Sequence, residues 1–221
     1  MKKIDTVLWD LDGTLLCTLT DLAASVNYAL AQNRMPKRTE EEVKSFVGNG
    51  IRLLMERAVP DGKANPAFDK AFADFQAHYA VNCNNSTKPY DGIPALLQKL
   101  KRRGCKMAVV SNKIDSAVKD LVQIYFADTI TFAVGDNPQR AKKPAPDNVL
   151  FALEQLGSSP ENAVYIGDSE VDIMTAKNAG LPMIIVDWGY KTKEFLEQKG
   201  AENIVSTPEQ LLKVFNDLST C

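Results

Sequence analysis

The stretch Asp10-Leu11-Asp12-Gly13-Thr14-Leu15 decides how the rest of the chain is interpreted. It follows the apolar run Val7-Leu8-Trp9, which predicts a buried strand that ends on two acids. Residues two apart in a strand point to the same face, so the carboxylates of Asp10 and Asp12 are expected to share one crevice. Neighbouring carboxylates repel each other, and a bound cation such as Mg2+ relieves that repulsion. The alternative is a plain acidic turn, because Asp-Gly turns are common.

The composition is that of a globular protein and gives no sign of a nucleic-acid or membrane partner. The 221 residues are 45% hydrophobic and 24% charged, and the formal net charge is -2. No apolar run approaches the roughly 20 residues of a membrane helix, and no secretory signal is visible, so we expect a cytoplasmic protein. The four cysteines are scattered, which favours free thiols over a zinc site or disulfides. His78 is the single histidine, so histidine-based catalysis has little support.

Residues 16–89 are expected to form an all-helical insert. Helices are predicted over residues 21–32, with Thr20 as the capping residue, and over residues 51–58. Between them, Thr39 and Glu42 have the spacing of a capping box. A later apolar stripe at helical spacing is expected to pack inside a helical bundle, and it consists of Phe68, Phe72, Phe75 and Tyr79.

From residue 90 onward, predicted strands and helices alternate with short loops. This pattern predicts a parallel sheet covered by helices on both faces. We therefore expect an α/β fold, with a Rossmann-like parallel sheet core formed by residues 1–15 and 90–221 and interrupted by the helical insert. Ligands of such sheets bind at the carboxyl ends of the strands. The predicted strands cover residues 4–10, 106–111, 129–134, 163–167, 183–186 and 203–205; the helices between them cover 93–103, 115–124, 146–156, 171–179, 193–199 and 208–218.

Two further segments of this core suit a phosphate group. Ser111 and Asn112 end a predicted strand just before a helix, where free backbone amides favour phosphate; the simpler interpretation is that they only start the helix. Lys142-Lys143-Pro144 places a cation immediately before another helix, and a surface lysine is the alternative there.

A third acidic position follows the predicted strand over residues 163–167. Asp168 is expected at the strand end, and Asp172 one helical turn later, facing the same spot. Acids at a helix N-terminus also complement the helix dipole. Beside Asp10 and Asp12, however, Asp168 is better interpreted as a further carboxylate for Mg2+, which takes oxygen ligands.

These four segments, in this order, resemble the motifs of the haloacid dehalogenase superfamily. The first motif is D-x-D-G-T-L after an apolar strand, and the second is a Ser or Thr, as in Ser111-Asn112-Lys113. The third is a lysine that related phosphatases write as K-P-x-P, which selects Lys143 over Lys142, and the fourth is G-D-x-x-x-D, as in Gly167 to Asp172. The stretches Val47-Gly48-Asn49-Gly50-Ile51 and Trp188-Gly189-Tyr190 look most like the phosphoglycolate phosphatase branch. The chain departs from many relatives after Leu15: they continue with one further residue and then Asp-Ser, whereas this chain has Leu16-Cys17-Thr18.

The resemblance implies a Mg2+-dependent phosphomonoester hydrolase acting on a small phosphorylated metabolite, phosphoglycolate above all. Asp10 is the implied nucleophile, which forms an aspartyl-phosphate, and Asp12 is the implied acid and base. Mg2+ is expected on Asp10, the Asp12 carbonyl and Asp168, with Asp172 either a further ligand or a residue that orients a water or Lys143. The expected substrate-binding residues of the core are Ser111, Asn112, Lys143 and Thr14. The insert is the implied cap, and its expected substrate contacts are Asn49, Gly50 and Arg52, although Arg52 can equally be a plain surface charge.

Other functions stay open at this stage. A sugar phosphomutase would need a cap that protects the aspartyl-phosphate from water, and a pyrophosphatase or nucleotide phosphatase would differ in the same cap. A non-catalytic phosphate-binding module is of a different class, and it is disfavoured because Asp10, Asp12, Lys143 and Asp168 are all present. No G-x-G-x-x-G follows a strand, which disfavours a dinucleotide-binding enzyme. We expect a monomer or homodimer.

Overall fold

A computed structural model describes residues 4–48 and 50–220 of the chain. It divides into two compact units, one formed by Met1–Leu16 and Pro89–Cys221 and the other by Cys17–Lys88. Two short strands, β2 (Leu16–Cys17) and β3 (Lys88–Pro89), pair with each other where the chain passes between the units.

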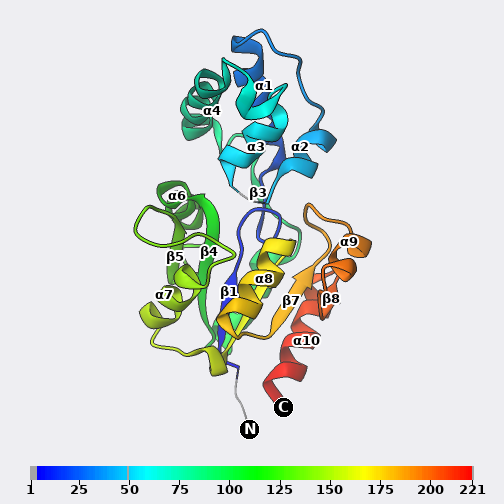
Figure 1. Cartoon of the computed structure of the whole chain (residues 1–221). Helices are drawn as coiled ribbons and strands as arrows, with labels where there is room; N and C mark the ends of the chain where they lie inside the picture. The colour runs from blue at the N-terminus through cyan, green and yellow to red at the C-terminus, as the bar shows by residue number, and fades with distance from the viewer. Residues whose placement is uncertain (1–3, 49, 221) are drawn as a thin grey trace. The chain divides into compact units, whose positions relative to one another are not determined.

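The larger unit is built on a six-stranded parallel sheet in the order β5-β4-β1-β6-β7-β8 (Figure 1). β1 therefore lies inside the sheet, between β4 and β6, with parallel pairing on both sides. This confirms the predicted α/β class. The strands are β1 (Thr6–Trp9), β4 (Lys106–Ile114), β5 (Phe132–Asp136), β6 (Ala163–Gly167), β7 (Met183–Val186) and β8 (Ile204–Val205).

Helices cover both faces of this sheet because successive side chains of a strand point to opposite sides. Val7 and Trp9 pack in one hydrophobic core with α5 (Ile93–Arg102), α6 (Asp115–Phe126) and α10 (Pro208–Thr220). Leu8 packs in the other core with α7 (Asp147–Gln155), α8 (Glu170–Ala179) and α9 (Lys193–Gln198). A short 3-10 helix, η2 (Pro160–Asn162), precedes β6. Burial on both faces explains why the strands read as unbroken apolar runs.

The end of β4 differs from the prediction. The strand continues to Ile114, three residues beyond Ser111, and its register against β5 shifts between Val110 and Ile114. The shift lets Ile114 pair again with Asp136, so the backbone stays extended until α6 begins at Asp115. Ser111 and Asn112 therefore lie within the strand, and the predicted run of helix amides directly after them is not formed there.

The smaller unit contains α1 (Leu19–Gln32), α2 (Glu40–Phe46), α3 (Ile51–Ala58), the 3-10 helix η1 (Gly62–Ala64) and α4 (Phe68–Asn82). The predicted capping box is confirmed, because the Thr39 N–H donates to Glu42 and the Glu42 N–H donates to the Thr39 hydroxyl. The prediction that Thr20 caps α1 is wrong: the helix begins at Leu19, with Thr18 at the capping position.

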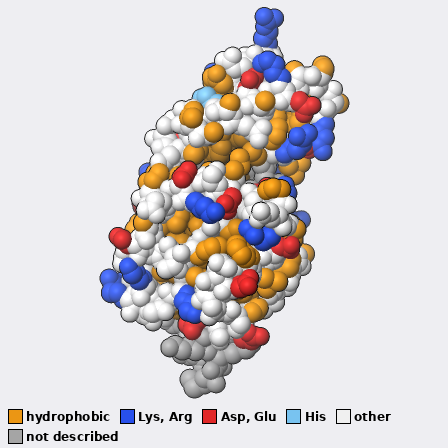
Figure 2. Space-filling model, turned by 90° about the vertical axis from the view of Figure 1, so that its left-hand side faces the viewer, with side chains coloured by type: hydrophobic (Ala, Val, Ile, Leu, Met, Phe, Trp, Pro, Cys, Tyr) orange, Lys and Arg blue, Asp and Glu red, His pale blue; other side chains and the backbone are white. Residues whose placement is uncertain are grey.

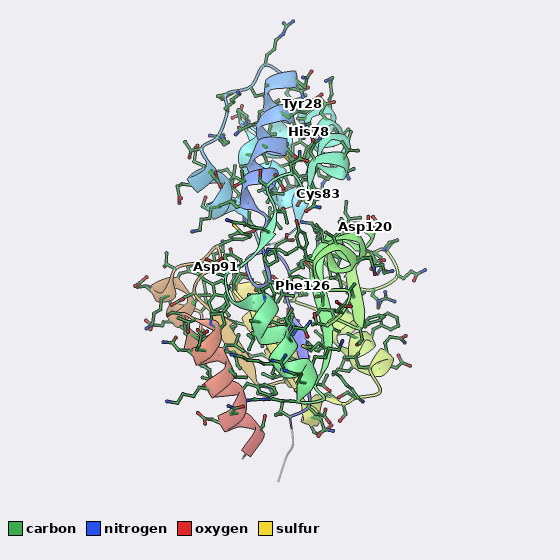
Figure 3. The ribbon with its side chains drawn as sticks, turned by 180° about the vertical axis from the view of Figure 1, so that it is seen from behind. Tyr28, His78, Cys83, Asp91, Asp120 and Phe126 are labelled. Carbon is green, nitrogen blue, oxygen red and sulfur yellow. The ribbon has the colours of Figure 1, made fainter. Side chains whose placement is uncertain are left out.

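His78 has a packing role within this unit. Its ring stacks on Tyr28 with the centroids 4.1 Å apart, and its Nδ1 lies 3.0 Å from the Ser25 hydroxyl (Figure 3). The contact joins α4 to α1.

The surface carries charges of both signs, as expected for a chain with a formal net charge of -2. Both acidic and basic side chains are distributed over the face shown in Figure 2. Among the described residues, no helix combines the length and the apolar character that crossing a membrane requires.

Candidate active site

The carboxyl ends of three neighbouring strands, β4, β1 and β6, carry the predicted polar residues of the larger unit. Asp10 directly follows β1, and its N–H donates to the Ile166 carbonyl at 2.8 Å, which holds it against β6. Asp168 directly follows β6, and Ser111 lies near the end of β4. Parallel strands end at the same edge of a sheet, so these residues are brought to one place.

Three buried carboxylates meet at this edge. Oxygen atoms of Asp10, Asp168 and Asp172 all lie within 4.8 Å of one another. Burial raises the pKa of Asp10 to about 7, with Lys143 opposing the rise and Asp172 adding to it. Burial and the nearby charges of Asp172 and Asp10 hold the pKa of Asp168 well above its usual value. The cluster therefore resists carrying three negative charges unless a cation is close.

Lys143 lies between two of these carboxylates. Its Nζ donates to Asp10 Oδ1 at 2.7 Å and to Asp172 Oδ1 at 2.8 Å. It also lies 3.0 Å from the Tyr165 hydroxyl. Burial would lower the pKa of Lys143, but Asp10 and Asp172 hold it well above the ordinary value, so the ammonium stays charged. Lys143 is thus a fixed positive charge beside Asp10.

Asp172 is committed to contacts within the protein. It sits in the first turn of α8, which Ser169 caps, and its Oδ2 accepts from both the N–H and the hydroxyl of Ser169. Its Oδ1 lies near Lys143 and 3.0 Å from the Tyr165 hydroxyl. Both Asp172 oxygens therefore have hydrogen-bond partners within the protein. The hydrogen bond from Lys143 to Asp172 orients the lysine beside Asp10.

Two glycines allow the backbone to close around Asp168. A Cβ on Gly13, whose φ is +87°, would lie 2.3 Å from Asp168 Oδ2, and one on Gly189 would lie 2.2 Å from the same atom. The Tyr190 N–H donates to that oxygen at 2.7 Å. A side chain at either glycine would displace the carboxylate.

The donor set fits a hard divalent cation. The cluster offers carboxylate oxygens only, which Mg2+ and similar ions prefer. Three carboxylates beside one charged lysine leave an excess of two negative charges when all are ionised. A divalent cation would balance that excess.

Asp12 has a different partner. Its Oδ1 accepts from Lys113 Nζ at 2.8 Å, and the Lys113 side chain is only 4% exposed. The Asp12 side chain is 21% exposed, so it is the more accessible of the two acids in the first motif. Asp12 pairs with a lysine, whereas Asp10 faces the carboxylate cluster.

The polar residues expected to bind substrate lie around the same edge. Ser111 is buried, and its hydroxyl accepts from the Lys113 N–H at 3.2 Å. Asn112 donates to the Lys143 carbonyl at 3.0 Å, which fixes the loop that carries the lysine. Asn112 Oδ1 and Thr14 Oγ1 are buried and have no hydrogen-bond partner among the described residues.

Three residues of the helical unit were expected to contact substrate, and the structure describes two of them. Asn49 lies outside the described residues. Gly50 is the residue before α3 and has a φ of +85°. Arg52 is exposed, with Glu56 at 3.6 Å and Asp69 at 3.7 Å, and it lies over the rings of Phe68 and Phe72. Within its own unit, Arg52 has the contacts of a surface charge.

The comparison with known proteins assigns the family. The family model of haloacid dehalogenase-like hydrolases matches residues 7–186, which is most of the chain. The chain belongs to the haloacid dehalogenase-like hydrolase family. This confirms the family predicted from the four motifs, and the match starts in β1 and ends with β7.

Several curated relatives of this hydrolase are phosphatases, and the similarity covers most of each relative's length. Phosphoglycolate phosphatase of Aquifex aeolicus is 33% identical over 213 residues, which cover 96% of both chains. Phosphoglycolate phosphatase of Rhodospirillum rubrum is 34% identical, over 97% of this chain and 88% of its own. N-acetylmuramic acid 6-phosphate phosphatase of Pseudomonas aeruginosa is 30% identical, over 97% and 96%.

Solved structures of similar proteins have the same fold. A protein of Lactobacillus delbrueckii that is assigned as a phosphoglycolate phosphatase superposes with a TM-score of 0.92 at 34% identity, over 96% of this hydrolase and 98% of its own chain. A predicted phosphoglycolate phosphatase of Haemophilus somnus gives 0.88 at 28% identity, over 97% and 99%.

Four residues of this hydrolase's site received no role from the sequence, although Lys113 and Tyr190 stand within quoted motifs. Lys113, Tyr165, Ser169 and Tyr190 all contact the predicted acids or Lys143. Ser169 could have been found, because a serine three residues before an acid is a capping signal. Lys113 stands two residues after Ser111 in an extended segment, which places both on one face.

Proposed function

We propose that the chain is a Mg2+-dependent phosphomonoester hydrolase that forms an aspartyl-phosphate on Asp10, with phosphoglycolate as the best-supported substrate. One observation carries this proposal: a charged lysine and a cluster of carboxylates surround Asp10 at the carboxyl edge of the sheet. The named phosphatases among the relatives support the same reaction and the small phosphorylated substrate.

Asp10 and Asp168, with the Asp12 carbonyl, are the residues that would hold the metal. Bound there, Mg2+ would offset the negative charge of the phosphoryl group. Asp172 has both oxygens engaged by Ser169, Lys143 and Tyr165, so its role is to orient Lys143.

Asp10 acts as the nucleophile in the first step. A carboxylate oxygen attacks phosphorus, a P–O bond to Asp10 forms, and the P–O bond to the leaving group breaks. Lys143 holds Oδ1 at 2.7 Å, which fixes the orientation of the carboxylate, and its charge attracts the phosphoryl oxygens.

Asp12 moves the protons. It donates a proton to the leaving oxygen as the ester bond breaks, and then takes a proton from the water that attacks phosphorus in the second step. That step releases inorganic phosphate and regenerates Asp10. Asp12 suits this task because it is more exposed than the clustered acids and can meet a leaving group and a water.

The phosphoryl oxygens are held by the polar groups around Lys143. The Ser111 hydroxyl and the Asn112 backbone N–H come from the end of β4, and the Thr14 hydroxyl comes from the loop after β1. The buried atoms Asn112 Oδ1 and Thr14 Oγ1 lack a protein partner among the described residues, which leaves them available to ordered water at the site. The helical unit serves as the cap, with Asn49, Gly50 and Arg52 as the candidate substrate contacts.

The test is phosphate release from a panel of substrates with Mg2+ and with a chelator. The panel contains 2-phosphoglycolate, N-acetylmuramic acid 6-phosphate, pyrophosphate, nucleotides and glucose 1-phosphate. We expect Mg2+-dependent release that is strongest with 2-phosphoglycolate, and conversion of glucose 1-phosphate to an isomer would instead indicate a mutase.

Asp10→Asn should abolish turnover while the circular dichroism spectrum is kept. The matched control is Asp120→Asn, an exposed aspartate on α6 (Figure 3), which should keep full activity. Activity that survives in Asp10→Asn would show that the nucleophile is another group.

A further inference from the structure

The ammonium group of Lys143 has three hydrogens, and the structure gives each of them an acceptor. Two acceptors are carboxylate oxygens, Asp10 Oδ1 at 2.7 Å and Asp172 Oδ1 at 2.8 Å. The third is the hydroxyl oxygen of Tyr165 at 3.0 Å. Lys143 is 4% exposed and Tyr165 is 0% exposed, so this set of contacts is closed to solvent. A contact between Lys143 and a phosphoryl oxygen therefore requires one of the three to be given up.

Tyr165 is the partner that Lys143 can release at the lowest cost. Its contact with the ammonium joins a charged group to a neutral one, whereas the other two contacts join opposite charges. Its own hydroxyl hydrogen keeps acceptors, because Asp172 Oδ1 lies at 3.0 Å and the Val110 carbonyl oxygen at 3.3 Å. Release of the lysine therefore leaves no buried donor of Tyr165 unsatisfied, and an unsatisfied buried donor is the costly case.

The hydroxyl of Tyr165 is not required by the packing of its ring. Tyr165 lies in β6, and its ring packs in the apolar core that contains Leu8. A phenylalanine would fill the same space there. Burying a hydroxyl costs free energy unless it forms hydrogen bonds, and among its partners only Lys143 belongs to the proposed reaction beside the nucleophile. The position of this hydroxyl therefore points to a task at the lysine.

We propose that Tyr165 is a positioning residue that holds the third hydrogen of Lys143 and gives it up when a phosphoryl oxygen binds. The hydroxyl keeps the ammonium aligned between Asp10 and Asp172, and the phosphoryl oxygen then takes its place as the acceptor. No covalent bond changes in this exchange. The inference rests on the proposed function, in which Lys143 attracts the phosphoryl oxygens, and it adds a residue from the interior of the sheet to that machinery.

The experiment removes the hydroxyl and measures phosphate binding separately from turnover. Titration calorimetry with Mg2+ present gives the dissociation constant of inorganic phosphate, and kcat is measured with the best substrate of the panel. Both are determined for the wild type, Tyr165→Phe and Tyr28→Phe. Tyr28 is the matched control, because it is an exposed tyrosine of α1 whose ring stacks on His78 (Figure 3).

In Tyr165→Phe, one hydrogen of Lys143 has lost its acceptor, and a phosphoryl oxygen supplies a replacement. We expect inorganic phosphate to bind about two- to tenfold more tightly, the equivalent of one neutral hydrogen bond. We expect kcat to fall by about tenfold, because Lys143 is less firmly aligned beside Asp10. Tyr28→Phe should change neither value.

A residue that only supports the fold would show a different pattern, because its loss would weaken phosphate binding and turnover together. Phosphate binding that is weaker or unchanged in Tyr165→Phe, or an unchanged kcat, would overturn the inference.

The wild type provides a second test that does not depend on the stability of a variant. With carbon-13 at the tyrosine Cζ position, the NMR signal of Tyr165 reports hydrogen bonding at its oxygen. We expect this signal to shift as phosphate is added in the presence of Mg2+, because the oxygen loses the hydrogen of Lys143. A signal that stays fixed at saturating phosphate would overturn the inference, although the hydrolase assignment stands. If the wild type neither binds phosphate nor hydrolyses any member of the panel, the proposed function itself fails.

Discussion

Replacing Lys143 with Met tests how the carboxylate cluster is held together. Methionine keeps most of the side chain's length but removes the charge and the hydrogen bonds to Asp10 at 2.7 Å and Asp172 at 2.8 Å. In the metal-free protein, the acids of the cluster would then lie within 4.8 Å of one another without a balancing cation. Removing one partner from a buried ion pair costs about 3–5 kcal/mol of unfolding free energy.

The size of this loss depends on pH in a direction that the structure fixes. The pKa of Asp10 is raised to about 7 in the folded protein, and Lys143 opposes that rise. Without Lys143 the pKa of Asp10 rises further, so at pH 6 the folded variant binds a proton that relieves the repulsion. At pH 8 this relief is smaller. The destabilisation of Lys143→Met should therefore be larger at pH 8 than at pH 6.

Urea unfolding of the metal-free protein at both pH values measures this difference. The control is Lys142→Met, which removes an exposed neighbouring lysine and should change stability by less than about 0.5 kcal/mol. Lys143→Met should also lower kcat by about 10²–10³-fold, the usual effect of losing one preorganised charge-stabilising donor. A stability loss as small as that of Lys142→Met would refute the view that Lys143 holds the cluster together.

Three further predictions test the metal site and the helical unit. In the metal-free wild type, the melting temperature should fall as the pH rises from about 5 to about 8, because the pKa values of Asp10 and Asp168 are raised in the folded state and the two carboxyls lose their protons over this range. Saturating Mg2+ should reduce this fall. Scanning calorimetry with and without Mg2+ measures the melting temperature at each pH. Gly189→Ala should weaken Mg2+ binding by about tenfold or more in titration calorimetry, since its Cβ would lie 2.2 Å from Asp168 Oδ2; unchanged affinity would contradict the role of that carboxylate. Asp21→Asn should lower the unfolding free energy by about 1–3 kcal/mol in urea titrations, because the buried Asp21 carboxylate accepts hydrogen bonds from Ser86 and Thr87. A loss near zero would show that those hydrogen bonds contribute little to stability.

The sequence predicted the sheet because each strand is a short, unbroken apolar run. β6 and β7 were predicted with their observed ends, residues 163–167 and 183–186. The end of β4 could not be predicted, because it depends on a register shift against β5, and the partner strand lies some twenty residues away. Local propensity carries no information on such a pairing.

The sequence predicted the acidic residues of the site and Lys143, because they follow strand ends or belong to a motif. It did not predict the contacts between the site's side chains. Tyr165 lies in the middle of an apolar strand, and only the fold shows that its hydroxyl reaches Lys143 and Asp172. Lys113 is part of a quoted motif, but its pairing with Asp12 joins residues 101 positions apart. Long-range contacts of this kind arise from the topology of the sheet.

The most direct measurement is to trap the phosphorylated enzyme and locate the phosphoryl group. The enzyme is mixed with 2-phosphoglycolate and Mg2+, quenched during turnover and treated with borohydride, which reduces an aspartyl-phosphate to homoserine. Peptide mass spectrometry then identifies the modified position. We predict modification at Asp10 in the wild type and none in Asp10→Asn. Turnover with no modified Asp10, or with the modification on another residue, would contradict the central claim that Asp10 is the nucleophile.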